Sequence, residues 1–411
     1  LTALDDNPTG SIAPTTLTTP TGAAVDLNTA FDEAAQQSQD EDGTRSDTYH
    51  TDSVINALEN NTYGALNGTG NAYSITIDDA SVDAAALNTL DEKTTVVIDA
   101  SATITLSGTS TEINTAFTSP GISGLRDQDV ILSDISLTAS VLNALDDNTT
   151  GSIDASSITA LTGSATDLIE AVTSNGITGL GDEAITVDSG TATTAQANAL
   201  ADETSGIVTA TIAEGDLATL SGLTGTGNAY AITISDTAVN AAILNAINNK
   251  TINDINGQNI IQIEGTAEDI ATAYTAGGIN GLGDEEIIFT ASNINASDLI
   301  AIDSANSQVI DASTLTTLTG TAVDLNTAFD SGGISNLSDQ DVTLTDSSLT
   351  ASVLNALDGN TTGSIDASAV TTLTGTAVDL NTAFDSGGIS NLSDQDVTLT
   401  DTSLTASVLN A

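Results

Sequence analysis

The chain lacks cysteine, methionine and tryptophan, and it is poor in aromatic residues and cations. Of its 411 residues only 2% are aromatic, Lys and Arg together number 4, and there is one His. The absence of Cys excludes disulfides, thiol catalysis and zinc sites with Cys ligands. No run of 18 apolar residues occurs, so we expect no segment inserted in a membrane.

The same shortages leave little material for catalysis. His50 has no second His and no Cys with which to share a metal ion. Gly-rich pieces such as GTGNAY lack the Lys of a phosphate-binding loop. The few cations cannot build clamps for phosphate or carboxylate groups; they are Arg45, Lys93, Arg126 and Lys250. We therefore expect that the protein is not an enzyme.

What the chain does have is acid and small aliphatic side chains. Asp and Glu number 56, which gives a formal net charge of -52, and 39% of the residues are hydrophobic. Such a surface is repelled by phosphate backbones and anionic lipids, so nucleic acid is excluded as a partner. A core of Ala, Val, Ile and Leu without aromatics suits a solenoid better than a thick globule.

Internal repeats dominate the sequence. Residues 311–356 recur as residues 366–411 with three differences, at an offset of 55 residues. Older copies begin at Asp99 and Asp154, and a variant block at 67–95 returns at 224–252. Self-similarity at a fixed period indicates a repeat architecture. We interpret residues 1–411 as one continuous solenoid, with an irregular insertion at about 32–53 that is either a tolerated edge loop or a lateral contact.

Each 55-residue repeat contains two similar halves that alternate strand and helix. The first half has an alternating strand at Val342 and Leu344, followed by a helix with Thr350 as its N-cap. The helical apolar positions are Leu349, Val353, Leu354 and Leu357 in the first half, and Ala377, Leu380, Ala383 and Phe384 in the second.

This alternation predicts an α/β solenoid of stacked parallel strands and short helices, with about two coils per repeat. Coils of roughly 20 and 35 residues should alternate, which brackets the range of ~20–29 residues in leucine-rich repeats. An all-β solenoid is the alternative.

Acidic turns are the candidate cation sites. Each repeat carries an Asp-rich turn before a strand, and Asp-x-Asp supplies hard oxygen ligands of the kind that Ca²⁺ accepts. The candidate ligands are Asp127, Asp129, Asp339, Asp341, Asp394 and Asp396. Asp also forms turns and helix caps, so diffuse screening by cations is the alternative. About 15 coils at ~4.8 Å would carry roughly one charge per 1.4 Å, denser than duplex DNA at ~1.7 Å.

Several phrases resemble the repeats of very large, acidic surface proteins of marine cyanobacteria. They are LTGTAVDLNTAF, GISNLSDQDVTL, ASVLNALDGNTTGSIDAS and GTGNAYAITI. The family includes giant proteins needed for swimming in marine Synechococcus and related adhesin-like proteins. The resemblance implies an extracellular or cell-surface location and a structural or adhesive role, and it transfers no functional residues.

Two functions follow as expectations. The first is a structural repeat of an extracellular filament, sheath or surface layer that assembles with itself or with identical repeats. The second is a calcium-dependent adhesin stalk that binds glycan or neighbouring cells. The first and last residues, LTALDDN and LNA, are both in phase with LNALDGN at 354–360. Both ends therefore fall within an expected helix, and we expect the chain to be a window of a longer array.

Overall fold

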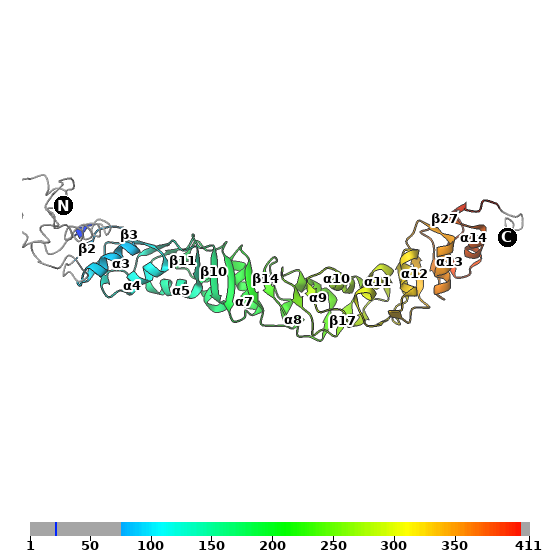
Figure 1. Cartoon of the computed structure of the whole chain (residues 1–411), viewed down its shortest axis with the longest axis horizontal. Helices are drawn as coiled ribbons and strands as arrows, with labels where there is room; N and C mark the ends of the chain where they lie inside the picture. Colours follow the sequence, from blue (N-terminus) through cyan, green and yellow to red (C-terminus); the bar gives the residue numbers. More distant parts are fainter. Residues whose placement is uncertain (1–20, 23–74, 404–411) are drawn as a thin grey trace, which may run out of the picture. The chain divides into compact units, whose positions relative to one another are not determined.

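The computed structural model describes residues 21–22 and 75–403, in which short parallel strands alternate with short helices (Figure 1). The predicted α/β solenoid is therefore confirmed, and the all-β alternative is wrong. The predicted insertion at about 32–53 and both chain ends lie outside the described residues. Among the residues described, no helix is both long and apolar enough to cross a membrane.

The chain divides into two compact units. The first comprises residues 1–191 and 199–209, and the second comprises 192–198 and 210–411. Helix α7 (Thr194–Glu203) and strand β13 (Val208–Thr211) lie at the division. The continuous solenoid remains a prediction.

The first unit has the following order. Its elements are β1 (Thr21–Gly22), β2 (Thr76–Ile77), β3 (Ser81–Asp83), α3 (Ala84–Lys93), β4 (Ile98–Asp99), β5 (Thr105–Gly108), α4 (Ser110–Thr118), β6 (Ile122–Ser123), β7 (Asp129–Leu132), β8 (Ser136–Thr138), α5 (Ala139–Asn148), β9 (Ile153–Asp154), β10 (Ala160–Ser164), α6 (Ala165–Thr173), β11 (Ile177–Thr178) and β12 (Ala184–Ser189).

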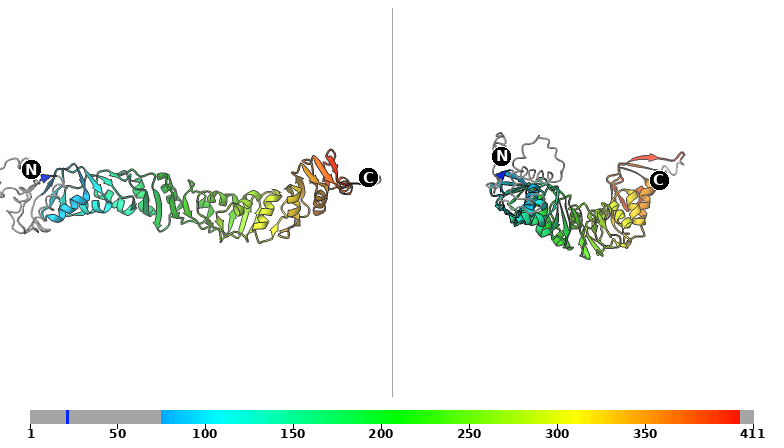
Figure 2. Two further views of the ribbon diagram at one scale, coloured as in Figure 1. Left: turned by 45° about the horizontal axis from the view of Figure 1, so that its top comes forward. Right: turned by 60° about the vertical axis from the view of Figure 1, so that its left-hand side comes forward.

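The second unit repeats this order, and Figure 2 shows the succession of coils from two further sides. Its elements are α8 (Leu217–Leu220), β14 (Ala229–Ala231), β15 (Ala238–Asn240), α9 (Ala241–Asn248), β16 (Ile255–Asn256), β17 (Gln262–Gly265), α10 (Ala267–Thr275), β18 (Ile279–Asn280), β19 (Glu286–Phe289), β20 (Asn293–Asn295), α11 (Ala296–Ala305), β21 (Ile310–Asp311), β22 (Thr317–Gly320), α12 (Ala322–Asp330), β23 (Ile334–Ser335), β24 (Asp341–Leu344), β25 (Ser348–Thr350), α13 (Ala351–Asn360), β26 (Ile365–Asp366), β27 (Thr372–Gly375), α14 (Ala377–Asp385), β28 (Ile389–Ser390) and β29 (Asp396–Leu399).

Successive coils pair through parallel strands in a recurrent register. Ser81 pairs with Thr105, which in turn pairs with Asp129, so equal stretches of chain separate the partners. Strands β20, β22 and β24 repeat this separation in the second unit. The expected alternation of coils of about 20 and 35 residues is wrong, because the sequence does not reveal which strands become partners.

Two such coils do not fill a whole 55-residue repeat. The remainder is the stretch of seven positions from the first residue of β24, Asp341, to the first residue of β25, Ser348. As a result one sheet contains strands from different positions of the repeat. Strand β24 pairs on one side with β22, which precedes a helix, and on the other side with β26, which follows one. The strand positions therefore shift around the solenoid from one repeat to the next.

Each helix buries every third residue against the strands. In α13 the buried residues are Ala351, Leu354 and Leu357. The other helices of eight to ten residues follow the same spacing where it is described, and α10 buries Ala271 in addition. Thr350 is the N-cap residue, although its side chain makes no capping hydrogen bond. Two of the positions predicted for the helical apolar faces are wrong, because Phe384 is 42% exposed and Leu349 belongs to β25.

The side chain at the first helical position is small because a glycine of the next coil packs against it. A Cβ added to Gly320 would lie 3.2 Å from the Cβ of Ala296, and one added to Gly375 would lie 3.0 Å from that of Ala351. This close approach explains why LTG precedes α12 and α14. It also keeps adjacent coils near enough for their side chains to bond.

We expect Gly320→Ala to destabilise the second unit by about 1–3 kcal/mol, because the added methyl group overpacks the contact with Ala296. Gly332→Ala is the matched control, since a Cβ there meets no heavy atom within 4 Å. Urea unfolding of the full chain, followed by circular dichroism, measures both variants. Equal effects of the two substitutions would contradict the close-packing explanation.

Candidate functional site in the acidic turns

The six candidate metal ligands form three pairs, each of which flanks a glutamine. Gln128 lies between Asp127 and Asp129, and the same arrangement surrounds Gln340 and Gln395. The six Asp side chains are exposed, whereas Gln128 is only 1% exposed. The structure thus brings the acids together in pairs at the start of β7, β24 and β29. Within the described ranges, no group of three or more His, Cys, Asp or Glu side chains is placed to hold a metal ion.

The second Asp of a pair ties its coil to the next one. Oδ1 of Asp129 accepts a hydrogen bond from the main-chain N–H of Ser152 at 2.8 Å. Asp341 accepts the equivalent bond from Ser364 at 2.8 Å. These two carboxylates therefore have a structural role whether or not cations also bind them.

The buried glutamine connects three coils, and it is not one of the acidic ligands predicted from the sequence. Nε2 of Gln128 donates to the carbonyl oxygen of Thr103 in the preceding coil at 3.1 Å and to that of Gly124 in its own turn at 2.8 Å. Its main-chain oxygen accepts from the hydroxyl of Thr149 in the following coil at 2.7 Å. The signal in the sequence was a Gln that recurs between two acids in three repeats.

Each glutamine turn contains one residue whose backbone lies in the left-handed region. The residue four positions before the glutamine has a positive φ: 87° at Gly124, 59° at Asn336 and 66° at Asn391. Gly and Asn adopt this region at the lowest cost. The bend brings the carbonyl of that residue to Nε2 of the glutamine.

A second set of acids caps the helix of the preceding coil. Oδ2 of Asp346 accepts from the N–H of Ala322, the first residue of α12, at 2.7 Å. Asp134 and Asp401 make the same contact to the first residues of α4 and α14. Because the N-terminus of a helix carries partial positive charge, each carboxylate is stabilised there.

A third set of acids closes turns after short strands. The set comprises Asp99, Asp154, Asp311 and Asp366, and each accepts the N–H of the serine two residues later at 3.0 Å. Hydrogen bonds from the side chain and main chain of Ser101 lower the pKa of Asp99 below its ordinary 3.8. The side-chain amide of Asn336, followed by the bonds from Ser313, lowers the pKa of Asp311.

Asparagines in the helices make a further contact between coils. Nδ2 of Asn355 donates to the carbonyl oxygen of Asp379 in the first turn of the next helix at 2.9 Å. Asn143 and Asn245 make the same bond to Asp167 and Asp269. The number of residues between Asn355 and Asp379 equals the number between paired residues of neighbouring strands. The strand register therefore aligns the helices as well.

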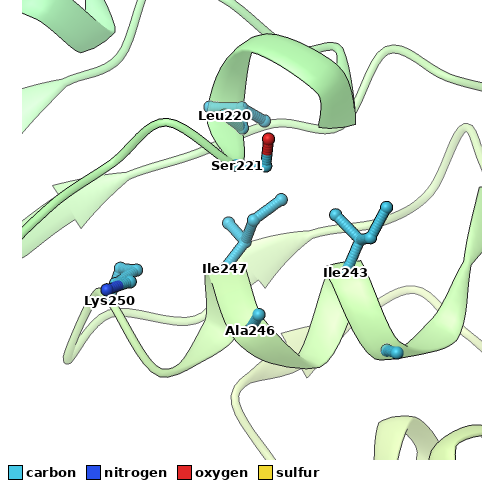
Figure 3. A pocket seen from close by; sticks show the side chains of 7 residues that line it. Leu220, Ser221, Ile243, Ala246, Ile247 and Lys250 are labelled. Atoms are coloured by element: carbon cyan, nitrogen blue, oxygen red, sulfur yellow. The ribbon is translucent and has the colours of Figure 1, made fainter.

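A shallow hollow lies where helix α8 is too short to cover α9 (Figure 3). It has a volume of about 220 Å³ and is lined by Leu220, Ser221, Ala242, Ile243, Ala246, Ile247 and Lys250. The lining is aliphatic apart from one hydroxyl and one ammonium group. The hydroxyl of Ser221 donates to the carbonyl of Ala218, which directs it into its own helical turn.

We expect Asp346→Asn to weaken the start of α12 by about 0.5–1 kcal/mol, because it removes the charge from a helix N-terminus. Asp339→Asn is the control, since it removes one negative charge from an exposed position in the same repeat. Amide hydrogen exchange at Ala322 measures the local opening free energy. Equal exchange rates in both variants would mean that only net charge matters.

We also expect stability to pass through a maximum as the pH falls from 7. Acidification first relieves repulsion among the acids, and high salt should diminish that gain. The lowered pKa values of Asp99, Asp154, Asp311 and Asp366 then act, because stability gained from a depressed pKa is lost as the pH falls through the folded-state value. Thermal melts between pH 7 and 2 should therefore decline below about pH 4. A continuous rise to pH 2 would contradict the structural role of these carboxylates.

Comparison with known proteins identifies no family. A scan against protein-family models finds no match, and a search of curated proteins finds no match either.

Proposed function

We propose that the chain is a non-catalytic structural segment of an extracellular filament, sheath or surface layer. The observation that carries the proposal is the recurrence of the same side-chain bonds between coils from repeat to repeat. Asp346 and Asp401 cap helices in the same way, and Gln128 and Gln340 connect coils in the same way. Because the same polar contacts join each coil to the next, coils can be added without new kinds of contact. Such a chain is suited to form a long structural segment.

The exposed surface supports assembly with identical repeats. Val323 and Val378 occupy the same position in successive repeats and are 64% and 66% exposed. Only three of 46 positions differ between residues 311–356 and 366–411, so exposed and buried side chains alike are kept. Copies of this surface would present the same contacts at each repeat. Identical chains or repeats are therefore the proposed partners.

Cations enter the proposal as counterions. Residues 341–395 contain seven acids and no Lys or Arg, and Asp394 is among the exposed ones. Neighbouring carboxylates on such a surface repel one another unless cations screen them. Ca²⁺ is the proposed ion because hard oxygen ligands favour it, with the exposed Asp pairs as its contacts.

The extracellular location rests on the resemblance to cyanobacterial surface repeats. Antibodies against the chain should label intact producing cells, and electron micrographs of released surface material should contain continuous arrays. An isolated stalk that binds glycan only in the presence of Ca²⁺ would instead favour the adhesin function. Labelling confined to permeabilised cells would refute both.

At low ionic strength we expect millimolar Ca²⁺ to raise the melting temperature of the full chain, and EDTA to reverse the change. Diffuse screening requires that Na⁺ at higher concentration reproduces the effect. The double variant Asp339→Asn/Asp341→Asn separates the two kinds of binding, because an ordered site there would lose part of the Ca²⁺ response. Identical midpoints with EDTA and with Ca²⁺ would rule out a cation requirement.

A further inference from the structure

Two buried glutamates occupy the position that other repeats give to the glutamine. Glu183 lies 55 residues after Gln128, and Glu285 lies 55 residues before Gln340. Both glutamates are 0% exposed. Their turns share one left-handed position, because Gly179 and Gly281 have φ values of 84° and 89° where Gly124 has 87°. They differ two residues before the glutamate, where Gly181 and Gly283 have φ values of 141° and 146°.

The main-chain connection to the following coil is also unchanged. The carbonyl oxygen of Glu183 accepts from the hydroxyl of Thr204 at 2.7 Å, as that of Gln128 does from Thr149. The carbonyl of Glu285 accepts from the side-chain amide of Asn306 at 2.7 Å. Glutamate and glutamine therefore occupy the same repeat position and make the same main-chain connection to the next coil.

One oxygen of each glutamate corresponds to the glutamine carbonyl oxygen. Oε2 of Glu183 accepts from the N–H of Asp182 at 3.1 Å, as Oε1 of Gln128 accepts from Asp127 at 3.2 Å. Oε2 of Glu183 also accepts from Gly181 at 2.6 Å. Since Oε2 of the glutamate corresponds to Oε1 of the glutamine, we infer that Oε1 of the glutamate occupies the position of the donating Nε2 of the glutamine.

That remaining oxygen has no partner. Oε1 of Glu183 and Oε1 of Glu285 are both buried without a hydrogen bond. In all three glutamine turns Nε2 donates to the carbonyls 25 and four residues earlier. The residues 25 and four positions before Glu183 are Ile158 and Gly179, so their carbonyl groups are the equivalent acceptors. An ionised oxygen facing two carbonyl oxygens is repelled, and a buried polar atom without a partner is costly.

We propose that Glu183 and Glu285 each carry a proton on Oε1 in the folded chain and donate it to these main-chain carbonyls. The protonated carboxyl group has the donor–acceptor pattern of the glutamine amide, with Oε1–H in place of Nε2–H. Each unit of the chain therefore contains one proton-binding site, at Glu183 in the first unit and at Glu285 in the second.

The surrounding charges favour proton retention. Asp182 adjoins Glu183 in the turn. Around Glu285 the neighbours are Asp284 and Glu286, and the hydroxyl of Tyr274 in α10 donates to Oε2 at 2.6 Å. Among residues 75–403, the bonds to the two carboxyl groups come from main-chain N–H groups and from Tyr274, and none comes from a cation.

A proton fits this position better than a metal ion does. In the glutamine turns, Nε2 lies 2.7–3.4 Å from its carbonyl partners, which is hydrogen-bond spacing. Oε1 in the same place needs only a hydrogen atom between it and either carbonyl. A metal ion would require additional space between these oxygens at ~2.3–2.6 Å from each.

Proton retention makes the fold sensitive to alkali. The unfolded chain releases these two protons above about pH 4.3, whereas the folded chain keeps them. Stability therefore falls as the pH rises, since the folded state binds more protons. Loss of either proton leaves a buried negative charge in the turn that connects three coils.

The test uses thermal melts of the full chain from pH 4 to 10 with Glu183→Gln, Glu285→Gln and the double variant. Glutamine already occupies this position in sibling repeats, so the variants should fold. We expect the midpoint to rise by about 2–4 °C per site at alkaline pH and the gain to vanish near pH 4. Glu264→Gln is the control, because it removes one charge from the exposed face of β17. Its effect should diminish in high salt, whereas that of the buried substitutions should persist.

The reverse variant and a direct readout complete the test. Gln340→Glu should create a third site and steepen the loss of stability with rising pH. In protein carrying carbon-13 at the glutamate carboxyl groups, two protonated signals should persist at neutral pH and disappear in the double variant. A gain independent of pH, or fully ionised signals at neutral pH, would overturn the proposal. A Ca²⁺ stabilisation lost in the double variant, but not in Glu264→Gln, would assign a metal ion instead.

Discussion

The recurrent register between parallel strands is the constraint on which the rest of the structure depends. Because the separation of paired residues recurs from coil to coil, a polar side chain at a fixed repeat position meets the same main-chain group each time. Asn355 bonds to Asp379, and Asp346 to Ala322, across this separation. The side-chain bonds therefore recur because the register recurs.

This register also explains how a chain with a net charge of -52 can fold with 4 Lys and Arg residues. Carboxylates in most proteins are paired with cations or left in water. Here Asp129, Asp346 and Asp366 accept main-chain N–H groups at strand starts, helix starts and turns. Because hydrogen bonds to an ionised acceptor are stronger than neutral ones, the acids stabilise the coils while they repel one another.

The sequence was sufficient for the fold class but not for the register or the central side chain of the turn. Alternating Val342 and Leu344 predicted β24, and Leu354 and Leu357 predicted α13, because local periodicity reports local structure. Phe384 was misplaced because its short helix, α14, buries one residue in three, which leaves little room for a wider apolar face. Gln128 was missed because its role depends on carbonyls contributed by another coil, and no spacing within the turn reveals them.

The repeat length also determines the direction in which each copy faces. A repeat of two whole coils would return every copy to the same side of the solenoid, whereas this repeat adds the stretch from Asp341 to Ser348 to its two coils. Each repeat is thus turned by a fraction of a coil relative to the one before it. If the segment packs beside identical copies as we propose, its equivalent exposed residues, such as Val323 and Val378, face successive directions. Neighbours on several sides could then make the same contact, which suits a bundle or layer better than a single pair of chains.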